Sequence, residues 1–151
     1  MTAVIVLEKA SDLDKKITLT NNDFKGLIEE DLVTSGFMAN ETVTYRDLLY
    51  GLLIKSGADC AKGLVNNIAS EEEFVSFMNE KAKELKLKNT SFSNPIGLDN
   101  EKNYSTATDV SKLFMYALKN DDFKKILTAD SYRTSNGHLT IKNNIRKSDC
   151  W

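Results

Sequence analysis

A serine and a glycine interrupt an apolar, helix-patterned run near the middle of the sequence. The run LLYGLLIKSGADCAKGL, residues 48–64, has leucines at helical spacing, stops at Ser56-Gly57 and resumes at Cys60. A serine hydroxyl becomes reactive only when a neighbouring base takes its proton, so such a break can deliver a polar group from the core to a site. The alternative is an ordinary corner between two core helices, since a glycine in the left-handed conformation ends many helices. Periodicity alone favours the corner, because such corners greatly outnumber catalytic turns.

Few other side chains offer chemistry. Cys60 lies on a predicted apolar helix face and Cys150 lies one residue from the end. Their separation and surroundings predict neither a disulfide nor a metal site, so we expect a buried thiol and a free terminal one. The single histidine, His138, lies beside a predicted turn with no Cys or carboxylate at ligand spacing, which favours a solvated turn residue. No cofactor is expected.

Helical periodicity and capping signals define the elements around the break. Thr44, with Asp47 three residues later, is a capping-box-like start for a helix that runs to about Lys55. A second helix is predicted from Cys60 to Ile68. Three more are predicted from the Ser70 cap to about Leu85, from the Thr106 cap to Ala117, and from Asp121 to about Leu127.

The β-structure expected from the sequence is small. Residues 15–20, KKITLT, alternate as a short half-buried strand, and the polar residues 21–42 are typical of an irregular connection. Asn136-Gly137 between two alternating runs predicts a hairpin that ends near Asn144. The residues expected to serve as turn and capping residues are Asn94, Pro95, Gly97, Thr106 and Asp109.

The composition is that of one soluble globular domain. The chain has 151 residues, of which 41% are hydrophobic and 28% charged, enough for a single core. The net charge is −2 and the lysines are spread among acids, so no nucleic-acid partner or polybasic membrane patch is expected. The start, MTAVIVLEKA, lacks the charged region and cleavage site of a signal peptide. Both ends resemble cuts, because residues 4–7 read as the tail of a buried element and IRKSDCW has no periodicity.

Four stretches carry a resemblance to a known family. They are MTA followed by VIVLE at residues 1–8, TVTYRDLLYGLL at 42–53 with SGAD at 56–59, TSFSNPIGL at 90–98, and NYSTATD at 103–109. In this order they resemble the low-molecular-weight penicillin-binding proteins, which are serine-type D-alanyl-D-alanine carboxypeptidases of peptidase class S11. The match runs from Met1 to about Ile145. One stretch would be weak evidence, whereas four in order are specific.

The resemblance implies a three-part site of S-x-x-K, an S-D-N-type triplet and K-T-G. Ser56 matches the triplet serine, which passes protons between the lysine and the leaving amine in that family. Ala58 stands where the triplet asparagine would hold the substrate backbone, and its methyl group cannot form a hydrogen bond. Asp59 either compensates in part for the missing asparagine or caps the second helix, and we favour the cap. No K-T-G follows, and no S-x-x-K with matching context occurs, so the resemblance puts the nucleophile and its lysine just before Met1.

The resemblance also implies a fold. We expect an α+β, predominantly helical chain, the helical lobe of the β-lactamase/penicillin-binding-protein transpeptidase-like fold with a small β-hairpin. Residues 1–145 would form a partial carboxypeptidase domain and residues 146–151 an irregular tail. A serine β-lactamase relative would share this architecture, but the TSFSNPIGL loop and the Y-S-T-A segment favour the carboxypeptidase.

The function implied by the resemblance is that of a serine-type D-Ala-D-Ala carboxypeptidase of peptidoglycan maturation. It would work through an acyl-enzyme in the cell envelope, outside the cytoplasm, on a peptidoglycan stem peptide or a β-lactam. The chain alone is expected to be inactive, because it lacks the nucleophile. The alternative is a non-catalytic truncated or pseudoenzyme fragment that at most binds peptidoglycan or a partner chain. Exposed helix faces also favour a homo-oligomer or a domain swap.

Overall fold

The structure is a computed structural model, and it describes residues 1–143. These residues confirm the expected α+β, predominantly helical fold with a small hairpin. The predicted hairpin end near Asn144, the predicted domain boundary at residue 145, the tail 146–151 and Cys150 lie outside the described residues.

Six α-helices are the main regular elements in the described part of the chain. They are α1 (Thr2–Lys9), α2 (Tyr45–Lys55), α3 (Ala58–Asn66), α4 (Glu71–Glu84), α5 (Ala107–Ala117) and α6 (Asp121–Leu127). The five helices predicted from periodicity correspond to α2 to α6, and the buried opening run forms α1. None of the helices within residues 1–143 is long and apolar enough to cross a membrane.

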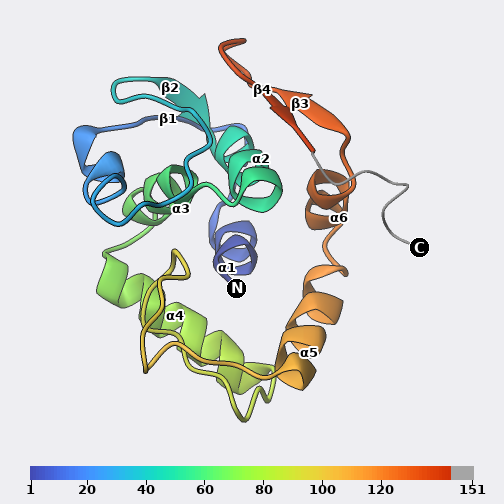
Figure 1. The fold of residues 1–151 in the computed structure, drawn as a ribbon. Helices are drawn as coiled ribbons and strands as arrows, with labels where there is room; N and C mark the ends of the chain where they lie inside the picture. Colours follow the sequence, from blue (N-terminus) through green and yellow to red (C-terminus); the bar gives the residue numbers. More distant parts are fainter. Residues whose placement is uncertain (144–151) are drawn as a thin grey trace.

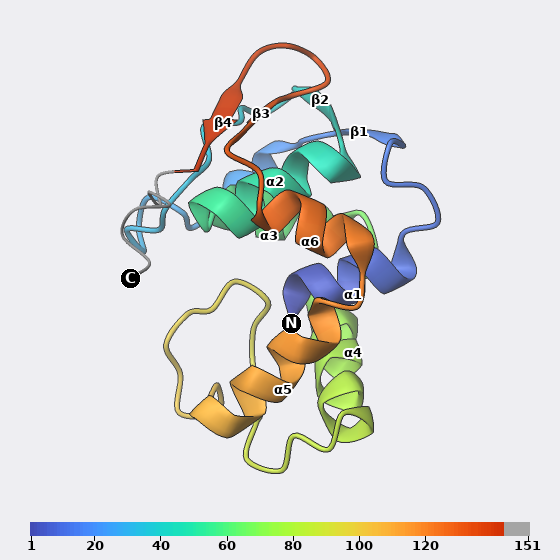
Figure 2. The same cartoon turned by 90° about the vertical axis from the view of Figure 1, so that its right-hand side faces the viewer.

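The short helix α1 is the centre of the molecule (Figure 1). Its residues Thr2 to Val6 are buried, and it contacts α2, α3, α4 and α6. Figure 2 shows α4, α5 and the long loop between them on one side of α1, with α2, α3, α6 and both sheets on the other. The start of α1 therefore lies where the two sides of the molecule meet.

Side-chain caps start the helices where the sequence predicted them. The Asp47 N–H donates to Thr44 Oγ1 at 3.1 Å, and the Thr44 N–H donates to Asp47 Oδ2 at 2.8 Å, which completes a capping box for α2. The hydroxyls of Ser70 and Thr106 likewise accept the N–H three residues on. These bonds use donors that would otherwise lack partners, and they fix where α2, α4 and α5 begin.

Two small antiparallel sheets complete the described fold. Strands β1 (Lys16–Thr18) and β2 (Thr42–Thr44) pair with Ile17 opposite Val43, and β3 (Ser131–Arg133) pairs with β4 (Thr140–Lys142) as the predicted hairpin. The strand β2 and the 3-10 helix η1 (Asn21–Phe24) were not predicted, and both fall in or beside the stretch treated as an irregular connection. Three residues are too few for an alternating pattern to be recognised.

The helix α5 leaves large apolar side chains exposed. Val110, Phe114 and Met115 are all exposed, although Phe114 makes an edge-to-face contact with Phe123 of α6 at a ring-centre distance of 6.1 Å. Large apolar side chains exposed together on one helix can mark a contact surface.

Candidate active site

The break between α2 and α3 is a tight corner centred on Ser56. Ser56 ends α2 with φ 56° and ψ 35°, in the left-handed region, whereas Gly57 precedes α3 with φ −69°. The expectation that the glycine supplies the left-handed residue is therefore wrong. For an L-amino acid other than asparagine or aspartate this conformation is unfavourable, so the surroundings of Ser56 must hold it.

Gly57 is needed for space and not for its φ angle. The residue is buried, and a Cβ atom at this position would overlap Ser35 Oγ and lie 2.6 Å from Asp59 Oδ1. The next residue, Ala58, donates its N–H to the carbonyl oxygen of Val33 at 2.8 Å. The loop of residues 33–37 thus passes directly against the corner.

Asp59 connects the corner to that loop. Its side chain lies in the first turn of α3, is 0% exposed, and accepts the Ser35 N–H with both oxygens, at 2.9 Å and 3.1 Å. The start of α3 at Gly57 has no side-chain cap, so the expectation that Asp59 caps this helix is wrong. Burial raises the pKa of Asp59, and hydrogen bonds from the N–H groups of Ser35 and Cys60 oppose this only in part.

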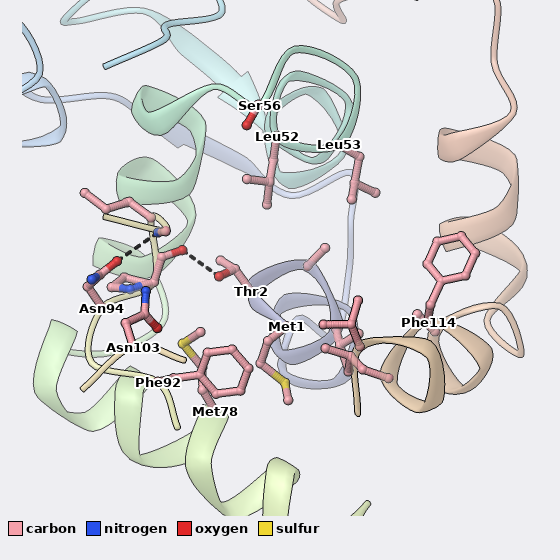
Figure 3. A pocket seen from close by; sticks show the side chains of 18 of the residues that line it. Met1, Thr2, Leu52, Leu53, Ser56, Met78, Phe92, Asn94, Asn103 and Phe114 are labelled. Atoms are coloured by element: carbon pink, nitrogen blue, oxygen red, sulfur yellow. Dashed lines mark hydrogen bonds between the residues drawn. The ribbon is translucent and has the colours of Figure 1, made fainter. Parts of the chain in front are cut away.

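Ser56 lies exposed at the rim of a cavity of about 460 Å³. Figure 3 shows Ser56 with Leu52 and Leu53 at one edge of the cavity. Asn94 and Asn103 lie on one side of it, and Phe114 of α5 lies on the opposite side. The polar side chains that line the cavity are those of Thr2, Ser56, Asn94 and Asn103. The remaining lining is apolar, so the cavity has the mixed character of a site that orients a ligand with a few polar groups.

One wall of the cavity is the loop organised by Asn94. Its Oδ1 accepts the N–H groups of Gly97 and Leu98 at 2.8 Å and 2.9 Å, which confirms the turn role predicted for Asn94. The Thr2 hydroxyl donates to the Pro95 carbonyl oxygen at 2.6 Å and joins this loop to α1 (Figure 3). The place of Thr2 and Asn94 in the cavity wall was missed from the sequence, because no local pattern signals a contact across 93 positions.

The side chains of the described residues that line the cavity offer a hydroxyl but no activating base. Ser56 Oγ makes no hydrogen bond with residues 1–143, and the side chains of the described residues that line the cavity include no lysine, histidine or carboxylate. A free hydroxyl can both donate and accept a proton, but it is a poor nucleophile without a base. Within the described residues, no group of three or more His, Cys, Asp or Glu side chains is placed to hold a metal ion.

Three further residues that the sequence singled out, Ala58, Cys60 and His138, do not line the cavity within the described residues. Ala58 is buried and is not among the described residues that line the cavity, so the position of the expected asparagine presents no side-chain polar group there. Cys60 is a buried free thiol, as predicted. His138 lies in the hairpin loop, and its Nδ1 is 2.8 Å from Glu41 Oε1, a contact that the sequence did not predict.

Known proteins resemble the chain in both sequence and structure. The D-alanyl-D-alanine carboxypeptidase of Streptomyces sp. strain K15 is 31% identical over 100% of this chain and 54% of its own length. DacF, a D-alanyl-D-alanine carboxypeptidase of Bacillus subtilis, is 44% identical over 64% of this chain and 25% of its own. The crystal structure of the Streptomyces K15 DD-transpeptidase superposes with a TM-score of 0.86 and 31% identity, and covers 94% of this chain and 60% of that one.

The fold, with a serine at the corner of two core helices beside a cavity, is that of the penicillin-binding DD-peptidases. Residues 1–148 match the family described as D-alanyl-D-alanine carboxypeptidase, peptidase S11. The chain belongs to this family. It spans about half the length of the Streptomyces carboxypeptidase that it matches.

Proposed function

We propose that this chain is the helical part of a serine-type D-alanyl-D-alanine carboxypeptidase and that Ser56 is its proton-relay serine. The observation that carries the proposal is the corner itself, where an exposed serine hydroxyl without a hydrogen-bond partner among residues 1–143 stands at the rim of the cavity. A hydroxyl of this kind can accept a proton from one group while donating its own to another. The membership of the chain in the S11 family supports this assignment.

The proposed reaction removes the terminal D-Ala from a peptidoglycan stem peptide through an acyl-enzyme. In the whole enzyme the serine of an S-x-x-K motif would attack the peptide carbonyl, and Ser56 would pass a proton from the lysine to the departing amine. A β-lactam would acylate the same serine. We place such an enzyme in the cell envelope, outside the cytoplasm, because its substrate is there.

We further propose that the 151 residues alone are inactive. The sequence contains neither an S-x-x-K nor a K-T-G motif, so it lacks a nucleophile, its base and the strand that would supply an oxyanion donor. The second candidate function, a non-catalytic fragment that at most binds peptidoglycan or a partner chain, rests on this same observation.

Labelling with a fluorescent penicillin tests the inactivity. The purified chain is incubated with the reagent and examined by intact-mass spectrometry beside an active carboxypeptidase of the same family. We expect an adduct on the active enzyme and none on the chain. A stoichiometric adduct on the chain would show that it carries a nucleophile after all.

A chimera tests the role of Ser56. This chain is joined to the segments of the Streptomyces relative that carry S-x-x-K and K-T-G, and D-Ala release is measured. The substitution Ser56→Ala should lower kcat by about 100-fold or more, because a proton-transfer step loses its relay. The matched control is Ser105→Ala, since the Ser105 hydroxyl bonds to Thr90 Oγ1 at 2.8 Å and is not among the described cavity residues. Unchanged turnover in the Ser56 variant would refute the assignment.

A further inference from the structure

We infer that Asp59 is a positioning residue that, by holding the loop 33–37 against the corner, keeps Ser56 in its left-handed conformation. We call Asp59 and the loop 33–37 together the corner clamp. The functional meaning of the clamp rests on the proposed role of Ser56. Its effect on the Ser56 backbone is a separate matter, which can be measured in a protein without activity.

The first part of the clamp is the contact between Asp59 and Ser35. Both carboxylate oxygens accept one backbone N–H from the loop, and the side chain is completely buried. A carboxylate buried at this depth is costly unless donors surround it, and the N–H groups of Ser35, Phe37 and Cys60 are the donors that oppose the effect of burial on its pKa. Two of the three donors belong to the loop. The loop therefore stabilises the buried carboxylate, and the carboxylate in turn holds the loop in place.

The second part is the close approach of the loop to the corner backbone. Ser35 Oγ occupies the space that a side chain at position 57 would fill, and it accepts a hydrogen bond from Cys60 Sγ at 3.3 Å. The Ala58 N–H donates to the Val33 carbonyl oxygen at 2.8 Å. The loop therefore contacts the two residues that directly follow Ser56.

These contacts explain how an unfavourable conformation persists at Ser56. The serine side chain makes no hydrogen bond with residues 1–143, so it does not stabilise its own left-handed backbone. The support comes from both neighbouring peptides, since the Gly57 N–H donates back to the Gly51 carbonyl oxygen at 3.2 Å and the Ala58 N–H donates to the loop. If the loop moves away, the second of these bonds is lost and the Ser56 backbone can relax from the left-handed region toward the right-handed or extended region.

Asp59→Asn tests the clamp in the full 151-residue chain. The new NH₂ group would face the backbone donors that the carboxylate now satisfies, which should release the loop while the side-chain size is unchanged. The matched control is Asp23→Asn, because Asp23 is 1% exposed and accepts from the Thr20 N–H and from Asn66 Nδ2, far from the corner in the chain. The readout is the set of backbone ¹³C shifts of Ser56 by NMR, which report its φ and ψ angles.

We expect the Ser56 shifts to move from left-handed values toward the average of several conformations in Asp59→Asn and to stay unchanged in Asp23→Asn. The Ala58 amide should exchange with solvent at least about tenfold faster in Asp59→Asn, as loss of a hydrogen bond to a charged group shifts a local equilibrium by that much. Left-handed shifts retained in a folded Asp59→Asn would overturn the inference. Because neither readout needs catalysis, the clamp can be refuted or supported whatever the outcome of the turnover experiments.

A measurement on the unmodified chain keeps the inference testable if Asp59→Asn does not fold. The amides of Ser35 and Ala58 should exchange through one opening, with the same free energy and the same dependence on dilute denaturant, because both bonds break when the loop leaves. The Thr44 amide, held by Asp47, serves as the reference for a bond outside the clamp. Exchange of Ala58 through an independent opening while Ser35 stays protected would contradict the clamp.

Discussion

Ser56 has a backbone conformation that a glycine would adopt at lower cost. At φ 56° the Ser56 Cβ is crowded by the backbone, which costs about 1–2 kcal/mol of stability. A glycine would avoid this cost, but the greater entropy of its unfolded chain would offset part of the gain. We therefore expect Ser56→Gly to raise the free energy of unfolding by about 0.5–1 kcal/mol, measured by urea denaturation. Serine at position 56 therefore makes the chain less stable than glycine would, but it places a hydroxyl at the cavity.

Two further variants calibrate that prediction. Ser56→Ala keeps the crowded Cβ and removes a hydroxyl without a partner in the described chain, so its unfolding free energy should stay within about 0.5 kcal/mol of the wild type. Lys86→Gly, at φ 56° after α4, should gain stability as Ser56→Gly does. A loss of stability in Ser56→Gly alone would mean that the serine side chain has a structural partner.

Asp47 is the residue on which the hairpin depends most. Its carboxylate is 0% exposed and accepts the Tyr132 hydroxyl at 2.9 Å, the Ser135 N–H at 2.8 Å and the Ser135 hydroxyl at 2.5 Å, in addition to the Thr44 N–H. Asp47→Ala should lower the free energy of unfolding by about 2–4 kcal/mol, because it leaves the buried Thr44 N–H and the donors of Tyr132 and Ser135 without this acceptor. Asp122→Ala, which removes a partly exposed partner of Arg46, should cost less than about 1 kcal/mol. Equal losses in the two variants would contradict this difference.

The same carboxylate should make stability depend on pH. Burial by itself raises the pKa of Asp47, but hydrogen bonds from Ser135, Thr44 and Tyr132 outweigh burial and hold the pKa below its ordinary value. The unfolded chain then binds this proton at a higher pH than the folded chain. The stabilisation is complete above the unfolded pKa of about 3.9 and is lost as the pH falls through the folded value. We expect the stability difference between wild type and Asp47→Asn to shrink below about pH 4, and a constant difference would refute this.

At the level of elements, helices α2 to α6 were predictable and the corner geometry was not. The helices carry their own signals, such as the Thr44 capping box and the apolar spacing that follows it, and these act over a few residues. The position of Ser56 at a cavity followed only from the family resemblance. Ser35, in the loop that fixes the corner, lies 24 residues before its partner Asp59, and a contact between an acid and a distant backbone N–H has no sequence pattern. The general preference of glycine for the left-handed conformation led to the prediction that Gly57 adopts it. The sequence does not show that Ser35 occupies the space beside Gly57, which is the reason for a glycine at that position.

The crossing of α2 and α3 depends on Gly51. A Cβ atom at Gly51 would overlap Cys60 Sγ and lie 2.9 Å from Ser35 Oγ. Gly51→Ala should therefore cost about 1–3 kcal/mol of unfolding free energy through overpacking. In a Cys60→Ala background the thiol is absent, and the same substitution should cost at least about 1 kcal/mol less, a coupling measurable by a double-mutant cycle. Additive losses would show that the two helices do not meet at this pair.

At the level of the whole molecule, the described residues bury a core and leave one helix poorly covered. The core surrounds α1, whereas Val110, Phe114 and Met115 of α5 are exposed. The chain spans about half the length of the Streptomyces relative that it matches. In the isolated chain we expect a second copy to contact α5, since exposed apolar surface beside a cavity favours association.

A matched pair of substitutions on exposed valines tests this association. Val110 is 53% exposed on α5, and Val33 is 59% exposed in the connection between β1 and β2. The wild-type chain should form dimers or larger species at concentrations on the order of 100 μM, as measured by light scattering and sedimentation. Val110→Glu should restore a monomer by placing a charge on the contacting face, whereas Val33→Glu, with the same change in charge and size, should leave association unchanged. A monomeric wild type at this concentration, or equal effects of the two substitutions, would exclude α5 as the contact.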